Sequence, residues 1–209
     1  GLALAFLLNR ASRRLLSLFF ERAFFYDPRE EPPFFEESEF PIQRVPLDEG
    51  NFRHALLATS SIPLVMDGIR DIAGANAGVY RDGGILDYHP ASFSPKEDRG
   101  IILYPHFSTR LIPGWFDKTL RRRNAHPEHQ KDMLMLVPSP QFISRLPFGR
   151  IPDRADFKTF DGREDERVAF WKEATSMGKI LADEFMESVL SGSIRTKVMR
   201  LEGQPGQAH

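Results

Sequence analysis

The longest regular pattern in this sequence is helical and lies in the last quarter of the chain. From Arg163 onward, large apolar residues recur at every third or fourth position. The residues on this face are Val168, Trp171, Ala174, Met177, Leu181 and Phe185. They predict a helix of about five turns with one apolar face, and Gly192 interrupts the pattern.

Shorter apolar runs precede this helix, and several of them have the length of a strand. Strands are predicted over 40–47, 79–81, 100–104 and 132–137, and helices over 2–26 and 51–59. An acidic, proline-bearing segment over 27–41 is expected to be a loop. Strands separated by helices predict an α/β fold.

Length and composition limit the kind of protein this can be. The 209 residues fit one domain or most of one, and we expect the domain to cover 1–202, with a polar tail over 203–209. The net charge of −1 argues against a nucleic-acid partner. The absence of cysteine excludes disulfides, thiolate nucleophiles and cysteine-bound metal.

The chain opens inside an apolar run, Leu2 to Leu8, with Gly1 in front of it. No basic segment precedes the run, so it is a poor signal peptide. Asn9 and Arg10 interrupt it well before the ~18 apolar residues of a spanning helix. We therefore expect a truncated chain that begins inside a larger, incomplete domain.

Two basic segments are possible contacts for a membrane surface. The predicted helix over 2–26 has arginines on one side and phenylalanines on the other, which also fits a core helix with a solvated face. Arg121, Arg122 and Arg123 form a basic triplet that suits anionic lipid headgroups or a plain solvated surface. We expect a cytoplasmic or membrane-peripheral protein.

Three short motifs follow one another between residues 55 and 90. Ala58-Thr59-Ser60-Ser61-Ile62-Pro63 ends a predicted helix, and Asp82-Gly83-Gly84 ends a predicted strand. Tyr88-His89-Pro90 follows shortly afterwards. Asp-Gly is a common turn pair, so the second motif alone would indicate only a turn. In this order and at this spacing, the three motifs resemble those of the patatin-like phospholipase family.

The resemblance implies a patatin-like central sheet flanked by helices and a serine lipid acyl hydrolase with a Ser–Asp dyad. Asp82 would be the base that takes the proton of the nucleophilic serine. Gly83 and Gly84 would let the backbone turn sharply beside the substrate. The substrate would be a lipid or another ester, cleaved through an acyl-enzyme without metal or organic cofactor. Asp87 or His89 stands where the family has an asparagine.

The sequence departs from the family in one major respect. The nucleophile elbow Gly-x-Ser-x-Gly does not occur, and neither does the glycine-rich oxyanion loop. Ser60 and Ser61 are expected to make hydrogen bonds at the helix end and not to act as nucleophiles. The serine would lie upstream of this chain, and these residues alone would be inactive. The alternative is a non-catalytic module of the same fold that acts in membrane or protein interaction.

Three further features of the sequence are candidate sites. His126, His129 and Asp132 could hold a metal, but Pro127 breaks the helix that would align the histidines, so a solvated loop is favoured. The segment 142–148 could line an acyl pocket or pack in a core. His106 follows a predicted strand, and the resemblance gives it no catalytic role.

Overall fold

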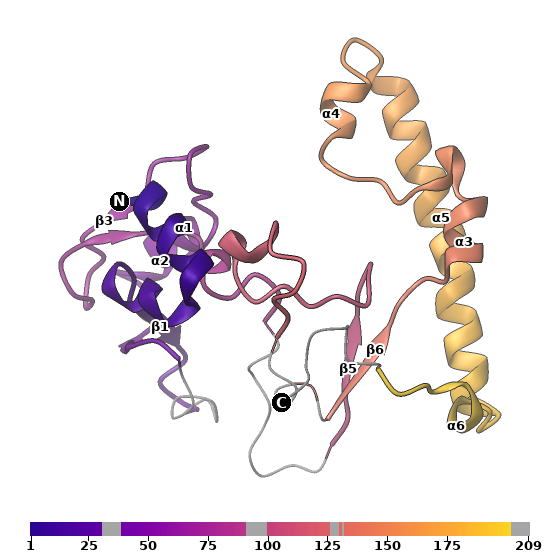
Figure 1. Cartoon of the computed structure of the whole chain (residues 1–209), viewed down its shortest axis with the longest axis horizontal. Coiled ribbons are helices and arrows are strands. Elements are labelled where there is room, and N and C mark those ends of the chain that lie inside the picture. Colours follow the sequence, from indigo (N-terminus) through magenta and orange to yellow (C-terminus); the bar gives the residue numbers. More distant parts are fainter. Residues whose placement is uncertain (31–38, 91–99, 126–129, 131, 202–209) are drawn as a thin grey trace. The chain divides into compact units, whose positions relative to one another are not determined.

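The computed structural model describes residues 1–30, 39–90, 100–125, 130 and 132–201. The chain divides into two compact units, and each is described by itself. Unit 1 comprises 1–102 and 110–134, and unit 2 comprises 103–109 and 135–209 (Figure 1). The tail expected over 203–209 lies outside the described residues. The single domain expected over 1–202 stays a prediction.

Unit 1 combines short helices with two small sheets. Its helices are α1 (Leu2–Ala11) and α2 (Phe52–Thr59), with 3-10 helices η1 (Arg13–Leu18), η2 (Gly83–Ile85) and η3 (Trp115–Asp117). Strands β1 (Arg22–Tyr26) and β2 (Ile42–Pro46) pair in parallel, from Arg22 opposite Ile42 to Tyr26 opposite Pro46. Strands β3 (Ile69–Arg70) and β4 (Val79–Tyr80) pair antiparallel.

Unit 2 is mostly helical. It contains α3 (Pro140–Arg145), η5 (Pro147–Gly149), α4 (Asp156–Thr159), the long α5 (Glu164–Leu190) and α6 (Ile194–Lys197). Strands β5 (Ile102–Pro105) and β6 (Met133–Leu136) form a third two-stranded sheet, and each strand begins in residues counted with unit 1 and ends in residues counted with unit 2. The predicted long helix is confirmed, and it ends at Leu190, shortly before Gly192 with its positive φ of 73°.

The fold is mixed α/β, as the pattern predicts, although the described residues form three two-stranded sheets. Within the helix predicted over 2–26, the α-helix ends at Ala11, a 3-10 helix follows over Arg13–Leu18, and the prediction is wrong beyond it. Ser12 has an extended backbone, with φ −155° and ψ 131°, and ends α1. The aromatic run over 24–26 then lies in a strand, because aromatic side chains favour strands and β2 supplies a partner.

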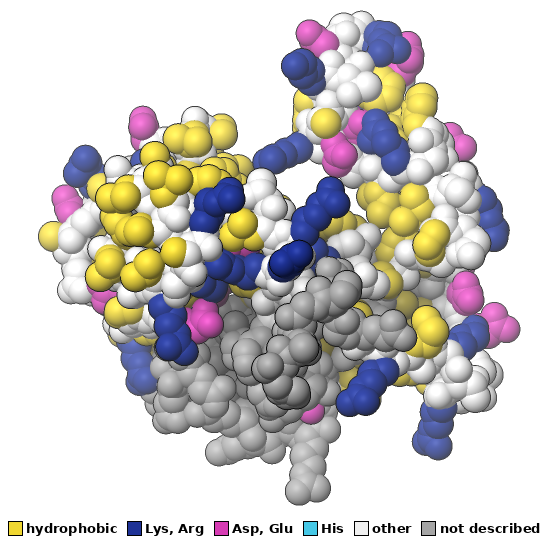
Figure 2. Space-filling view, in the orientation of Figure 1, with side chains coloured by type: hydrophobic (Ala, Val, Ile, Leu, Met, Phe, Trp, Pro, Cys, Tyr) yellow, Lys and Arg dark blue, Asp and Glu magenta, His cyan; other side chains and the backbone are white. Residues whose placement is uncertain are grey.

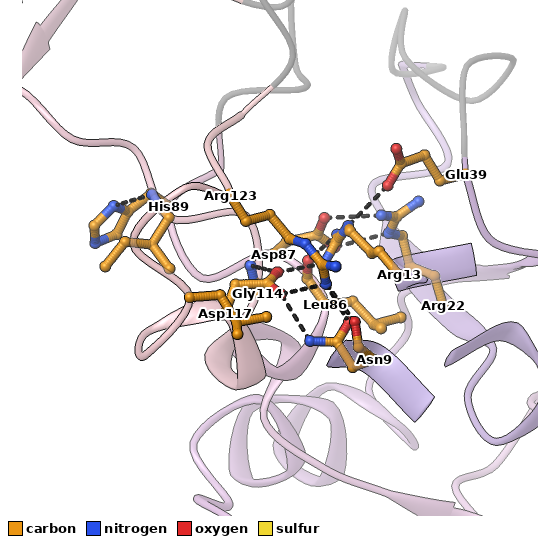
Figure 3. A network of polar contacts seen from close by, with 12 residues as sticks. Asn9, Arg13, Arg22, Glu39, Leu86, Asp87, His89, Gly114, Asp117 and Arg123 are labelled. Atoms are coloured by element: carbon orange, nitrogen blue, oxygen red, sulfur yellow. Dashed lines mark hydrogen bonds and ion pairs between the residues drawn. The ribbon is translucent and has the colours of Figure 1, made fainter. Parts of the chain in front are cut away.

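A buried carboxylate holds the core of unit 1 together (Figure 3). Asp117 is fully buried. Its oxygens accept hydrogen bonds from Asn9 at 2.7 Å, Arg123 at 3.0 Å and Arg13 at 3.2 Å, and from the backbone N–H of Gly114 at 3.0 Å. A Cβ on Gly114 would stand 2.7 Å from the carbonyl oxygen of Ile85, so only glycine fits there.

Apolar side chains surround this network. The buried cluster consists of Ala5, Leu16, Phe40, Ile85, Leu86 and Phe116, and Leu2, Phe6, Phe19, Phe20 and Trp115 pack against it. Because α1, η1, η2 and η3 all contribute, this one cluster joins segments that lie more than 100 residues apart in the sequence. It also fixes η2, the helix that follows Asp82.

Unit 2 has its own core, in which α5 packs on α3, η5 and α4. Leu146, Phe160, Phe170 and Ala174 are buried together, and Phe142, Ile151, Trp171 and Met177 pack against them. Phe142 and Leu146 therefore belong to a core, as one of the two interpretations of 142–148 holds. On the predicted apolar face of α5, Val168 is 42% exposed.

Asp156 is the buried acid of unit 2. Its carboxylate pairs with Arg150 and accepts hydrogen bonds from the Trp171 indole at 2.9 Å and the Asp153 backbone N–H at 2.9 Å. The Arg150 guanidinium is the main cause that lowers the pKa of Asp156 from 3.8 to about 2. Burial acts in the opposite direction and is outweighed.

Replacing Asp117 with asparagine should destabilise unit 1 by about 3–5 kcal/mol, because the partly buried guanidinium groups of Arg13 and Arg123 lose their shared counter-charge. Urea unfolding followed by circular dichroism measures this. Asp67→Asn, at an exposed position with no hydrogen bond to its side chain among the described residues, is the matched control. A D117N variant as stable as D67N would contradict the role given to Asp117.

The low pKa of Asp156 predicts a pH-dependent contribution to stability. Its folded pKa of about 2 lies below the ordinary 3.8, so the contribution is complete above about pH 4 and is lost as the pH falls through about 2. Asp156→Asn should cost about 1–3 kcal/mol at neutral pH and progressively less below about pH 4. Unfolding by urea across this range measures it, with exposed Asp183→Asn as control. A pH-independent difference would contradict the assignment.

Candidate functional site

Asp82 sits in a fixed turn between β4 and η2. Its backbone N–H donates to the carbonyl oxygen of Ser61 at 3.2 Å, and its carboxylate accepts the N–H of Gly84 at 2.7 Å. The carboxylate thereby caps the N-terminus of η2, where backbone N–H groups lack partners within the helix. Among the described residues, it makes no other side-chain hydrogen bond. One of its oxygens is therefore free to accept a further donor.

The hydroxyls of the two serines before Pro63 are engaged by backbone carbonyls of α2. Ser60 Oγ donates to the Leu56 carbonyl at 3.1 Å, and Ser61 Oγ donates to the Leu57 carbonyl at 2.8 Å. Ser61 is also 1% exposed. The predicted hydrogen bonding at the end of α2 is confirmed. Because Ser61 also accepts the Asp82 N–H, the first and second sequence motifs are in direct contact.

The third motif has a structural role in this chain. Asp87 forms a two-pronged ion pair with Arg22 of β1, with both N–O distances at 2.8 Å. His89 is buried, and its Nδ1 accepts the N–H of Ile112 at 3.0 Å. Asp87 and His89 therefore tie the turn after Asp82 to β1 and to the 111–114 segment.

A cavity of about 490 Å³ lies beside Asp82, within unit 1. Its lining comes from the segment after η1, from β1, β2, α2 and the β3–β4 hairpin, and from the Asp82 turn. Its apolar lining includes Phe19, Phe20, Phe24, Phe25, Leu47, Phe52, Ala55, Leu56, Ala58, Val79, Ile85 and Leu86. Phe52 and Leu56 are each 56% exposed, so the cavity opens to solvent along an apolar edge of α2. Thr59 supplies the only aliphatic hydroxyl among the described lining residues.

A neutral phenol adds a polar group to this cavity. The Tyr80 hydroxyl lies 2.5 Å from the Asn76 carbonyl oxygen and 3.2 Å from Gln43 Oε1. Burial raises the pKa of Tyr80, and the negative charges of Glu21 and Asp71 raise it further. Tyr80 therefore stays protonated, and its one hydroxyl proton is directed at the acceptors on Asn76 and Gln43.

The two glycines after Asp82 differ in what they allow. Neither has a positive φ, so the sharp turn expected of them does not need left-handed backbone. A Cβ at Gly83 would have 3.9 Å to its nearest neighbour, Thr59 Oγ1. A Cβ at Gly84 would stand 3.0 Å from Asp82 Oδ1. The lack of a side chain at Gly84 thus leaves room for the Asp82 carboxylate to accept the Gly84 N–H.

The sequence did not point to the cavity residues on β1 and β2. Arg22 and the phenylalanines of β1 were assigned to a helix, and no short motif marks them. The pairing of β1 with β2 brings these side chains to the cavity. The two strands are separated in the sequence by 27–41, part of which lies outside the described residues.

The remaining features that the sequence raises lie apart from this cavity or outside the described residues. The segment 126–129 lies outside them, and the described residues contain no group of acids and histidines that could hold a metal. No described helix is long and apolar enough to cross a membrane. His106 follows β5, with its Nδ1 2.6 Å from the Ser108 carbonyl oxygen.

Comparison with protein-family models, with curated proteins and with solved structures found no match to this chain.

The glycine geometry yields a test of the Asp82 turn. Gly84→Ala should destabilise the protein by about 1 kcal/mol or more, because the methyl group displaces the carboxylate from its N–H partner. Gly83→Ala should be neutral or up to about 1 kcal/mol more stable, because alanine restricts the unfolded chain. Thermal unfolding of the two variants compares them directly. The reverse order would mean that the turn is built differently.

Proposed function

We propose that this chain forms the base-bearing part of a serine lipid acyl hydrolase with a patatin-like arrangement of its sheet. Asp82 is the base of a Ser–Asp dyad, and the nucleophilic serine comes from a segment outside these 209 residues. The substrate is a lipid or another ester with an apolar acyl chain. No metal or organic cofactor takes part.

The observation that carries this proposal is the position of the Asp82 carboxylate. It lies at the wall of an apolar cavity, with one oxygen held by Gly84 and the other free of hydrogen bonds among the described residues. A base must meet the hydroxyl of its nucleophile at hydrogen-bond distance, and a rigid strand-end turn keeps it in place. The backbone bond from Asp82 to Ser61 supplies that rigidity.

The cavity supports an apolar acyl group as the part of the substrate that binds. Phe24 and Phe25 of β1, with Ala55 and Leu56 of α2, lie on its lining. Ligand sites of this size bury most of a small apolar ligand and use few polar groups to orient it. Asp82 and the Thr59 hydroxyl are among the polar groups on this lining that could orient an ester, and Gln43, Asn76 and Arg81 also lie on it.

One observation favours the second candidate, a non-catalytic module that acts in membrane or protein interaction. No serine or histidine lines the cavity among the described residues, and Ser60 and Ser61 donate to backbone carbonyls. In that case Asp82 would serve only as the cap of η2.

Labelling with a fluorophosphonate distinguishes the two candidates. The probe is applied to the longest form of the protein that occurs naturally, and intact mass is read over time. The proposal expects a single adduct on a serine outside these residues, formed at least ~100-fold more slowly after Asp82→Asn, since a general base contributes about that much or more.

Asp67→Asn is the matched control, because it removes an exposed carboxylate just before the β3–β4 hairpin, which Asp82 follows. It should label like the wild type. An absence of any adduct on a folded protein would favour the non-catalytic module. An adduct whose rate is unaffected by Asp82→Asn would leave the hydrolase but remove Asp82 as its base.

A further inference from the structure

The two basic segments that the sequence presents separately are neighbours in unit 1. Arg123 donates to the Asn9 carbonyl at 2.5 Å and to Asn9 Oδ1 at 3.1 Å, which places the 118–123 loop against the C-terminal half of α1. Arg13, just after α1, shares the Asp117 carboxylate with Arg123. The Asp117 network therefore joins these segments into one surface.

This surface carries more positive charges than its ion pairs neutralise. Residues 2–18 contain three arginines and no acid, and residues 118–125 contain four basic residues and no acid. Arg13 and Arg123 are engaged by Asp117. The side chains left exposed, with no ion pair among the described residues, are Arg10, Arg14, Arg121 and Arg122.

Apolar side chains stand on the exposed face of α1, beside Arg10. Leu4 is 52% exposed and Leu7 is 61% exposed, while Ala5 and Asn9 on the opposite face are buried. Helical spacing puts Leu4, Leu7 and Arg10 on one side of α1. Figure 2 shows hydrophobic side chains gathered on the unit that contains the N-terminus, with lysine and arginine side chains at their border.

We infer that this surface docks on anionic lipid bilayers, with Leu4 and Leu7 entering the headgroup boundary and the four arginines contacting acidic headgroups. A helix with exposed leucines and neighbouring arginines has the chemistry of an interfacial helix. Each basic side chain near an acidic bilayer adds about fivefold to binding. Nucleic acid is disfavoured, because it would use the arginines and leave the leucines exposed to water.

Vesicle co-sedimentation of the whole chain tests this. The vesicles are phosphatidylcholine alone or phosphatidylcholine with about one part in three phosphatidylserine. Binding is expected to the second kind only, and it should weaken as salt rises from about 50 mM to about 300 mM, over which charges are screened. The assay needs no nucleophile, so its result is independent of the proposed hydrolase.

Two double variants test the two parts of the surface. R121E/R122E and L4S/L7S should each weaken binding at least about tenfold while keeping the circular dichroism of the wild type. R154E/K158E in unit 2 makes the same change in charge at two exposed residues and should bind normally.

Three results would overturn the inference. The first is equal binding to neutral and acidic vesicles, or to neither. The second is a loss of binding in R154E/K158E as large as in R121E/R122E, which would reflect net charge alone. The third is retention on a single-stranded oligonucleotide, or a leucine-dependent dimer in sedimentation, without vesicle binding.

Discussion

The fold of unit 1 depends on one buried carboxylate and the two arginines that neutralise it. Asp117 has no exposed surface, and an unpaired charge in that position would be far too costly to bury. Arg13 and Arg123 come from opposite ends of the unit's sequence, and Asn9 completes the set. Charge pairing therefore joins the first and last segments of unit 1, and the apolar cluster of α1, η1 and η3 packs around these ion pairs.

The same network reaches the candidate site through short backbone contacts. Arg13 also donates to the carbonyl oxygen of Leu86 at 2.5 Å, at the end of η2. Gly114 packs against the Ile85 carbonyl, and the Asp82 carboxylate caps the start of η2. Two contacts thus fix the position of Asp82. Its backbone N–H binds the Ser61 carbonyl, and η2, which begins just after it, is held by the Asp117 network. A base that must hold its geometry benefits from such support.

Local patterns predicted the elements that need little tertiary help. The long helix α5, the helix end at Ser60 and Ser61, and the strand before Asp82 follow from spacing and from hydroxyl hydrogen bonding. The strand β1 was missed because an apolar run with arginines fits a helix equally well, and only pairing with β2 decides it. The Asp117 network was missed because its members are isolated residues more than 100 positions apart, and no motif marks them.

The proposed dyad requires a serine that meets Asp82 at this cavity. A crystal structure of the full-length protein with a long-chain alkyl phosphonate on its nucleophile tests this most directly. If Asp82 is the base, its carboxylate oxygen will lie about 2.6–3.2 Å from the Oγ of the modified serine, with the alkyl chain in the cavity between β1 and α2. A modified serine beyond reach of Asp82, with the cavity empty, would contradict it.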